Sequence, residues 1–270
     1  MTSSEIHPTA IIEHGAEIGA GCRIGPYCHI GGNVRLGPNN VLHAHVVIAG
    51  HTIVGQGNEI YPFCCFGTLA EDFRVHRGWV SHVRIGDGNI FREYTTVNAS
   101  ASDGGSTIIG SDCFLLSYSH VAHDCVLGDK VTLSCDSKIS GHVQIGESAI
   151  VSAKTGVVQF VRIGAFAFVG GFNKVAKDIL PFCIADGYPS VMRGVNKVGL
   201  ERNGFSAERI RIIRDAFRTM LRLGLRVSEA TERLNERYPD NADVREMTAF
   251  ANSSKTGLAR PRADDSGEEP

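Results

Sequence analysis

Residues 109–145 read IGSDCFLLSYSHVAHDCVLGDKVTLSCDSKISGHVQI. An aliphatic residue returns there at every sixth position, and these residues are Ile109, Leu115, Val121, Leu127, Leu133, Ile139 and Ile145. A period of six fits neither the 3.6-residue period of an amphipathic helix nor the alternation of a strand. The stretch therefore indicates a short repeated unit, and such repeats decide the architecture of the whole chain.

The same register continues on both sides of this stretch. Towards the C-terminus it passes through Val151, Val157, Ile163, Val169 and Val175. Towards the N-terminus it covers Ile85, Phe91 and Val97, and before them Ile6, Ile12, Ile18, Ile24, Ile30, Leu36, Leu42, Ile48, Val54, Ile60 and Phe66. The register breaks near 68–84 and near 99–106. We expect a loop at each break, and long loops inside a tight repeat are usually functional.

Each unit is expected to form a short strand and a turn, with its aliphatic residue pointing inward. Three six-residue units would close a triangular coil of 18 residues, and stacked coils would bury a continuous column of Ile, Leu and Val. The 31 glycines, against only 9 prolines, fit a chain with many tight corners. These features predict an all-β parallel helix over residues 1–190.

The period changes after the repeats, and residues 191–253 are expected to form a helical domain. Ser206 is a suitable N-cap, and an apolar stripe at helical spacing follows it. Further helices are expected over 228–238 and 242–252. Residues 254–270 are polar and end in DDSGEEP, which predicts a disordered tail.

The composition excludes several functional classes. A formal net charge of −2 gives no sign of a nucleic-acid partner, and no run approaches the roughly 18 apolar residues of a membrane span. The N-terminus has no secretory-signal pattern. The eight cysteines include no C-x-x-C pair, so we expect reduced thiols in a cytoplasmic protein.

The 18-residue coil also predicts a functional site. His123, Gly141 and Gln159 are each 18 positions apart and should stack in one column, with Asp124 and His142 in the neighbouring column. The repeat thus gathers two imidazoles, a carboxylate, a carboxamide and a glycine amide on one outer edge. Such a group can supply a general base, its orienting partner and an oxyanion donor.

A metal site is the competing interpretation of the same histidines. His120 and His123 form an H-x-x-H pair, a spacing that metal sites use. On a strand, however, residues three apart point to opposite faces. The pair is a poor set of joint ligands unless a corner separates them, so we expect neither a metal nor a cofactor.

Several runs resemble one enzyme family closely. They are His7-Pro8-Thr9-Ala10-Ile11, His51-Thr52, Asn58-Glu59-Ile60-Tyr61, Ala122-His123-Asp124-Cys125, Gly141-His142-Val143, Val169-Gly170-Gly171, Gly194-Val195-Asn196 and Arg202-Asn203-Gly204-Phe205. Together they resemble the bacterial acyl-acyl carrier protein:UDP-N-acetylglucosamine O-acyltransferases, which carry out the first step of lipid A synthesis. The resemblance extends to about residue 258. It implies a left-handed parallel β-helix followed by a helical domain.

The resemblance also implies roles for individual residues. His123 matches the general base, Asp124 the carboxylate that orients it, and Gly141 the amide facing the oxyanion. Substrate contacts are implied at Asp72, Arg74, Asn98, His120, His142, Gln159, Asn196 and Arg202. Gly171 lies where the family limits acyl-chain length. No cofactor or metal is implied.

This chain departs from the family pattern around the substrate. Asn98 and Val158 stand where a histidine is usual, and Asn203 where an arginine is common. These changes leave three alternatives open. One is the same chemistry on a nucleotide sugar with a 3-amino group, one is a zinc enzyme resembling γ-carbonic anhydrases, and one is a non-catalytic homologue.

Two partners are expected besides the UDP-sugar. Four arginines spaced four apart are predicted to share one helix face, with Arg211 nearby; they are Arg214, Arg218, Arg222 and Arg226. This face is either simply solvated or a docking strip for the acidic acyl carrier protein. The resemblance also implies a homotrimer with sites between subunits.

Overall fold

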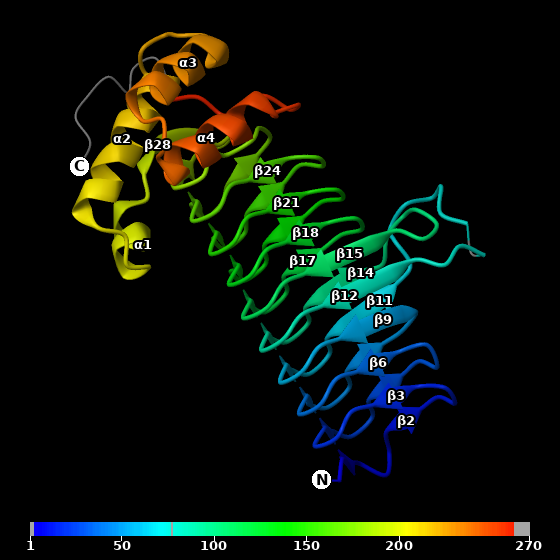
Figure 1. Cartoon of the computed structure of the whole chain (residues 1–270). Helices are drawn as coiled ribbons and strands as arrows, with labels where there is room; N and C mark the ends of the chain where they lie inside the picture. The colour runs from blue at the N-terminus through cyan, green and yellow to red at the C-terminus, as the bar shows by residue number, and fades with distance from the viewer. Residues whose placement is uncertain (1–2, 77, 262–270) are drawn as a thin grey trace.

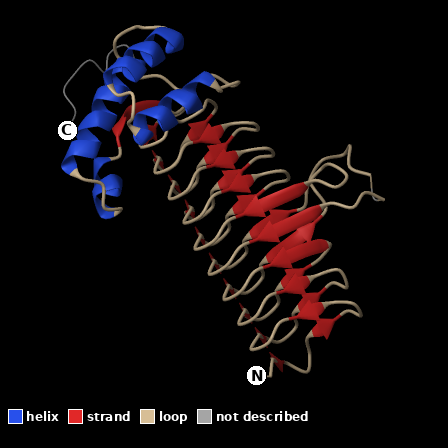
Figure 2. Cartoon of the chain, in the orientation of Figure 1, coloured by secondary structure: helices blue, strands red, loops and turns tan. Residues whose placement is uncertain are grey.

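The six-residue units fold into very short strands joined by tight corners, which build a three-sided prism (Figures 1 and 2). The computed structural model describes residues 3–76 and 78–261. The predicted fold is confirmed: the chain is a left-handed parallel β-helix with helices at its C-terminal end. The prism positions the site because every coil places equivalent residues at the same corner.

Three sheets form the walls of the prism. Sheet A contains β1 (Glu5–Ile6), β4 (Arg23–Ile24), β7 (Val41–Leu42), β10 (Glu59–Ile60), β13 (Ile90–Phe91), β16 (Phe114–Leu115), β19 (Thr132–Leu133), β22 (Ile150–Val151), β25 (Phe168–Val169), β27 (Cys183–Asp186) and β28 (Val191–Val195). Sheet B contains β2 (Ile11–Ile12), β5 (His29–Ile30), β8 (Val47–Ile48), β11 (Cys65–Thr68), β14 (Thr96–Asn98), β17 (His120–Val121), β20 (Lys138–Ile139), β23 (Gly156–Val157) and β26 (Lys174–Val175). Sheet C contains β3 (Glu17–Ile18), β6 (Arg35–Leu36), β9 (His51–Val54), β12 (His82–Ile85), β15 (Ser106–Ile109), β18 (Val126–Leu127), β21 (Gln144–Ile145) and β24 (Arg162–Ile163).

The strand register gives the predicted coil length. His120 of β17 pairs with Lys138 of β20, 18 positions along the chain. Where a loop is inserted the coil is longer, since Thr96 pairs with His120. Both inserted loops, residues 69–81 and 99–105, leave the prism between sheet B and sheet C. The two register breaks therefore meet at one corner, which we call the B–C corner.

The interior holds the repeated aliphatic residues. Leu115, Val121, Leu133 and Ile139 are completely buried, and burial of each such side chain stabilises the fold by about 1.5–3 kcal/mol. A polar ladder accompanies them at another corner. Asn40 Oδ1 accepts hydrogen bonds from the backbone and side chain of Asn58, and Asn58 Oδ1 accepts the same pair from Asn89. Each buried amide is thus satisfied by the next coil.

The C-terminal end departs in detail from the predicted boundaries. β28 pairs antiparallel with β27, so sheet A extends to Val195, beyond the boundary placed at 190. The helices that follow are α1 (Lys197–Arg202), α2 (Ala207–Leu221), α3 (Val227–Arg237) and α4 (Ala242–Asn252). The sequence did not predict α1.

The predicted arginine face is shorter than expected. Helix α2 ends at Leu221, and Arg226 is instead the N-cap of α3, where its backbone N–H and its guanidinium donate to the carboxylate of Glu229. Arg222 is the C-cap of α2 and donates to the carbonyl of Arg193 at 3.3 Å. Including Arg226 in the face was therefore wrong, because the helix stops one turn before it.

The tail prediction is wrong for residues 254–261, whereas residues 262–270 lie outside the described residues. Asp178, which is 1% exposed, accepts hydrogen bonds from the hydroxyls of Ser254 and Thr256 and from the backbone N–H and guanidinium of Arg162. Ala259 is buried. A buried carboxylate with several donors holds this polar segment on the prism, which composition alone does not reveal.

Two smaller expectations concern helices and thiols. Within the described ranges, no helix combines the length and the apolar character that crossing a bilayer would require. Six of the eight cysteines are buried. Burial raises the pKa of Cys125 to about 12, so this thiol stays protonated and acts as a small apolar residue.

Candidate functional site

The central site residues lie at the B–C corner, just after β17. Val121 points into the core, and the chain turns at Asp124, whose φ is 60°. His142 occupies the same place one coil later with φ of 61°. This left-handed conformation ends each strand and aims the side chains outward. The predicted columns are therefore formed by the corner itself.

His123 and Asp124 form a hydrogen-bonded dyad. Nδ1 of His123, a residue only 5% exposed, lies 2.8 Å from Oδ2 of Asp124. An ionised carboxylate can only accept, so Nδ1 carries the proton and Nε2 keeps its lone pair. The dyad therefore presents Nε2 as a base.

Gly141 packs against the ring of His123. A Cβ at residue 141 would lie 2.4 Å from Cε1 of that ring, so only glycine allows this approach. Among the described residues, no acceptor is recorded for the Gly141 N–H. A free amide beside a base is the arrangement that stabilises an oxyanion.

Two stacked rings continue the site upward. His142 meets His123 edge to face at 5.2 Å between ring centroids, and Phe160 stacks on His142 at 4.6 Å. Nε2 of His142 lies 3.7 Å from Asp124 Oδ2. Gln159 is exposed on the same corner, next to Phe160, whose N–H donates to the carbonyl of Gly141. These side chains form one wall beside the dyad.

The sequence missed the contacts that the second loop makes with Asp124. The hydroxyl of Ser100 donates to Oδ1, and the N–H of Ala101 donates to Oδ2 at 3.1 Å. Burial opposes ionisation of Asp124, but the hydrogen bonds from Ser100, His123 and Ala101 outweigh it and lower the pKa of Asp124. The only sequence sign of these contacts was the interruption of the repeat at 99–106.

Asn98 of β14 and His120 of β17 lie on neighbouring strands of sheet B. Burial lowers the pKa of His120 against the opposing negative charge of Glu71. Nδ1 of His120 lies 2.8 Å from the hydroxyl of Thr96. Asn98 is 4% exposed, and its Nδ2 donates to the Leu69 carbonyl and the Thr68 hydroxyl. Its Oδ1 has no partner among the described residues. A buried unpaired acceptor is costly, so this oxygen is available to a donor from outside the chain, and Asn98 stays a predicted substrate contact.

The first loop carries the predicted Asp72–Arg74 pair. The backbone N–H of Arg74 donates to Asp72 Oδ1 at 2.9 Å, and its guanidinium donates to both carboxylate oxygens. These hydrogen bonds, together with the positive charge of Arg74, hold the pKa of Asp72 well below its usual range. The loop therefore brings a fixed negative charge towards the dyad.

Three predicted substrate residues are not gathered at this corner. Asn196 caps α1, since its Oδ1 accepts from Gly199 N–H and its Nδ2 donates to the Phe166 carbonyl. Arg202 ends α1, which lies on the opposite side of the prism from the 69–81 loop (Figure 1). Gly171 lies near the C-terminal end of the prism, next to the exposed ring of Phe172. Within one chain, Arg202 does not reach the dyad.

A metal could also use part of this cluster. One ligand atom each from His123, Asp124 and His142 lie within 4.8 Å of one another. The His123 atom that meets Asp124 is already in a 2.8 Å hydrogen bond. The imidazole–carboxylate bond thus accounts for the closeness of the pair without an ion.

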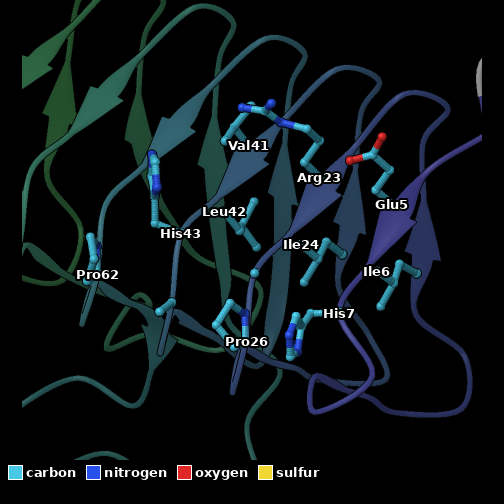
Figure 3. Close-up of a pocket in the computed structure, with 12 residues that line it drawn as sticks. Glu5, Ile6, His7, Arg23, Ile24, Pro26, Val41, Leu42, His43 and Pro62 are labelled. Carbon is cyan, nitrogen blue, oxygen red and sulfur yellow. The ribbon is translucent and has the colours of Figure 1, made fainter.

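A further hollow lies away from these residues. It measures about 820 Å³ and follows the outer face of sheet A near the N-terminus, between His7 and His43 (Figure 3). Its floor is largely apolar, and Nε2 of His43 is bonded to Glu59 at 2.9 Å. It contains none of the predicted site residues.

The fold and the dyad together define a hexapeptide-repeat protein with an acyl-transfer type of site. Comparisons with known proteins agree. Residues 15–50 match the family described as bacterial transferase hexapeptide (six repeats), and residues 178–259 match that described as Udp N-acetylglucosamine O-acyltransferase, domain 2.

Relatives and solved structures extend this match to the whole chain. A Burkholderia orbicola protein named acyl-[acyl-carrier-protein]–UDP-N-acetylglucosamine O-acyltransferase is 44% identical, over 95% of this chain and 100% of its own length. A protein of the same name from Verminephrobacter eiseniae is 42% identical over the same shares. The structure of Francisella novicida UDP-N-acetylglucosamine acyltransferase has a TM-score of 0.93 at 32% identity, covering 97% of this chain and 95% of that one.

The chain therefore belongs to the acyl-[acyl-carrier-protein]–UDP-N-acetylglucosamine O-acyltransferase family. It is a transferase by membership, which removes the zinc enzyme as an alternative. The predicted resemblance is confirmed.

Proposed function

We propose that the protein transfers a (3-hydroxy)acyl group from acyl carrier protein to the 3-position of UDP-N-acetylglucosamine, the first step of lipid A synthesis. The observation that carries this proposal is the His123–Asp124 dyad with Nε2 of His123 available beside the Gly141 amide. Both substrates appear in the names of the relatives. We also propose a cytoplasmic location, because both substrates are water-soluble.

The reaction proceeds by direct transfer. Nε2 of His123 removes the proton of the sugar 3-hydroxyl, and the oxygen forms a bond to the thioester carbon. The Gly141 N–H stabilises the negative oxygen of the tetrahedral intermediate. The carbon–sulfur bond then breaks, and the His123 imidazolium returns the proton to the departing thiolate. Asp124 stabilises the imidazolium between the two transfers.

The substrate-binding roles divide between the two sides of the corner. We assign Asp72 and Asn98, which lie in earlier coils than the dyad, and His120, which lies in the same coil, to the sugar side. His142 and Gln159, which lie one and two coils later, are assigned to the acyl side. Gly171, which lies between β25 and β26 and not at the B–C corner, is assigned to the acyl chain. This division follows the coil order along the prism. Arg74 serves by fixing Asp72. Mass spectrometry of products from a mixed acyl-carrier pool tests the acyl preference that we assign to Gly171.

A homotrimer would complete the site with Arg202, and Asn196 would position α1 for this contact. Sheet A offers an apolar outer stripe for assembly; it comprises Ile90, Phe114, Ile150 and Phe168. A subunit-mixing experiment tests the shared site. His123→Ala and Arg202→Ala proteins should each be inactive, and mixed trimers should regain about a quarter of wild-type activity because each site draws on two subunits. Mixtures that stay inactive would contradict a shared site.

Asn98 favours a second candidate acceptor, the sugar with a 3-amino group. The pairing of Val97 with Val121 places Asn98 next to Ala122, one coil below the dyad, with Oδ1 unpaired. A hydroxyl nucleophile has one hydrogen, which His123 takes, whereas an amine has a second hydrogen to donate to Oδ1. The product would then be an amide.

Parallel assays with the two sugars distinguish these acceptors. If the amine is preferred, kcat/KM for the 3-amino sugar exceeds that for the 3-hydroxyl sugar, and Asn98→His reduces the ratio. Equal or lower kcat/KM for the amine removes the second candidate. Failure of both assays with folded protein and several acyl chain lengths would favour the non-catalytic homologue and overturn the main proposal.

The remaining arginine face is proposed to dock acyl carrier protein. Arg211, Arg214, Arg218 and Arg222 surround a cavity of about 320 Å³ on α2. Positive charge there would speed encounter with an acidic partner. The effect should weaken with salt, because screening shortens the range of the attraction.

A further inference from the structure

Asp124 is held by more donors than the dyad requires. Its Oδ2 accepts from His123 Nδ1 at 2.8 Å and from Ala101 N–H at 3.1 Å, and its Oδ1 accepts from the Ser100 hydroxyl. Two of these three donors come from the inserted loop 99–105. The loop thus binds both carboxylate oxygens and shares Oδ2 with the imidazole.

The Ser100 hydroxyl is fixed in place. Ser100 is 1% exposed, and the backbone N–H of Ser102 donates to its Oγ at 3.0 Å. The hydroxyl hydrogen is therefore left to point at an acceptor, and a carboxylate attracts it more strongly than the Ser102 carbonyl at 3.3 Å. Gly105 makes room for it, because a Cβ there would lie 2.1 Å from Ser100 Oγ.

This arrangement sets both the position and the charge of Asp124. A hydrogen bond at Oδ1 fixes the rotation of the carboxylate, so that Oδ2 stays in line with His123 Nδ1. The same bond draws negative charge away from Oδ2. Both effects reach the base, because Asp124 determines the tautomer of His123 and the stability of its imidazolium.

We propose that Ser100 is a positioning residue that acts on the base through Asp124, with Gly105 as the residue that admits its hydroxyl. The inference rests on the proposed acyl transfer. Neither residue was among the site residues that the sequence indicated. Among the predicted site residues, the Ser100 hydroxyl is hydrogen-bonded to Asp124 alone, so its effect should appear in turnover and in proton affinity, not in sugar binding.

The direction of the pH effect follows from electrostatics. Without the Ser100 donor, Asp124 Oδ2 carries more negative charge and stabilises the imidazolium, so the pKa of His123 should rise. Activity requires neutral His123, and the acidic limb of kcat/KM should therefore move to higher pH. The other groups facing the dyad are Asp72, His120 and His142, and none of them changes in the variant.

Three variants test this assignment. Ser100→Ala removes the hydroxyl, and Gly105→Ala displaces it while keeping the serine. Ser102→Ala is the matched control, since the contacts of Ser102 with Ser100 run through its backbone. The measurements are kcat and KM from pH 5 to 9 with acyl carrier protein thioester and UDP-sugar. The pKa of His123 is followed in parallel by NMR of protein labelled at histidine Cε1.

We expect kcat of Ser100→Ala to fall roughly tenfold, with KM for the sugar unchanged and the acidic limb about half a pH unit higher. Gly105→Ala should move in the same direction, and Ser102→Ala should match wild type. A Ser100→Ala enzyme with wild-type kcat and pH profile would overturn the inference. The NMR titration is independent of turnover, so an unshifted His123 pKa also overturns it. Wild-type protein without activity would instead count against the proposed function.

Discussion

The two inserted loops leave the prism at the same corner, yet they differ in exposure: one carries exposed side chains, whereas in the other Ser100 is buried against Asp124. In the 69–81 loop, Phe73 is 99% exposed and the side chain of Arg74, which binds Asp72, is 73% exposed. In the 99–105 loop, Ser100 is 1% exposed and its hydroxyl bonds to Asp124. The first loop thus carries the residues predicted to bind substrate, and the second loop binds Asp124, the partner of the predicted base. A repeat separates these tasks easily, because an insertion in one coil leaves the next coil unchanged.

The loops are also joined to each other. The N–H of Val80 donates to Asp103 Oδ1 at 2.9 Å, and the N–H of Gly104 donates to the Val80 carbonyl at 2.7 Å. The inner loop therefore braces the end of the outer one. The separate contributions of the two loops can be tested with variants. The variants change the predicted base, each loop in turn, and a surface remote from both loops.

The largest effect should come from the base that both loops serve. His123→Ala should lower kcat on the order of 10²–10⁴-fold, the usual contribution of general base catalysis. Steady-state kinetics with UDP-sugar and acyl carrier protein thioester measure this, and circular dichroism checks the fold. His14→Ala, an exposed histidine at the same corner several coils lower, serves as the control. A His123→Ala protein with near-normal turnover would refute the mechanism.

Removing the charge of the outer loop should affect the substrate more than the base. Asp72→Asn should raise KM for the UDP-sugar roughly 10- to 100-fold, as loss of a charged hydrogen bond does. The acidic limb of the pH profile should shift much less than in Ser100→Ala. Arg74→Lys keeps a cation beside Asp72 and should stay near wild type. A change in kcat alone would show that the comparison of the loops is wrong.

Breaking the link between the loops should have an intermediate effect. Asp103→Ala removes the acceptor of Val80 N–H and should raise KM for the sugar roughly 2- to 10-fold, with kcat little changed. Hydrogen exchange of the 69–81 amides should become faster, because the loop opens more often. If Asp103→Ala reduces kcat as Ser100→Ala does, the two loops act as one unit.

The smallest effect should come from the surface remote from both loops. Arg218 is exposed on α2, so Arg218→Glu should raise KM for acyl carrier protein roughly 2- to 5-fold at low salt. KM for the sugar should be unaffected, and the difference should shrink at 0.5 M salt. If KM for acyl carrier protein does not depend on the charge of residue 218, this face is only a solvated surface and does not dock the carrier protein.

Most of the prism and the centre of the site were predictable because the repeat is exact in length. A six-residue period fixes which residue points inward. The coil of three such units, 18 residues long, places His123 beside Gly141 and Asp124 below His142. Structure confirms this closeness, with the His123 ring against Gly141. The roles of these residues in acyl transfer remain predictions.

Other features escaped the sequence because they depend on contacts between distant segments. Ser100 lies 24 positions from Asp124, outside the 18-residue register, because the inserted loop lengthens that coil. Residues 254–261 look like a free polar tail, yet the buried carboxylate of Asp178 binds two of their hydroxyls. Asn196 resembles a substrate residue, but its amide caps α1.

The sequence by itself determined the coil, the corner and the base, since a strict period converts spacing along the chain directly into position in space. The tertiary structure alone decided which donors surround Asp124, how the two loops bind each other and that Arg202 lies at the end of α1. The physical reason is that in a strict repeat the spacing of residues along the chain sets their positions in space. The conformations of inserted loops and helix ends depend instead on their contacts with distant segments.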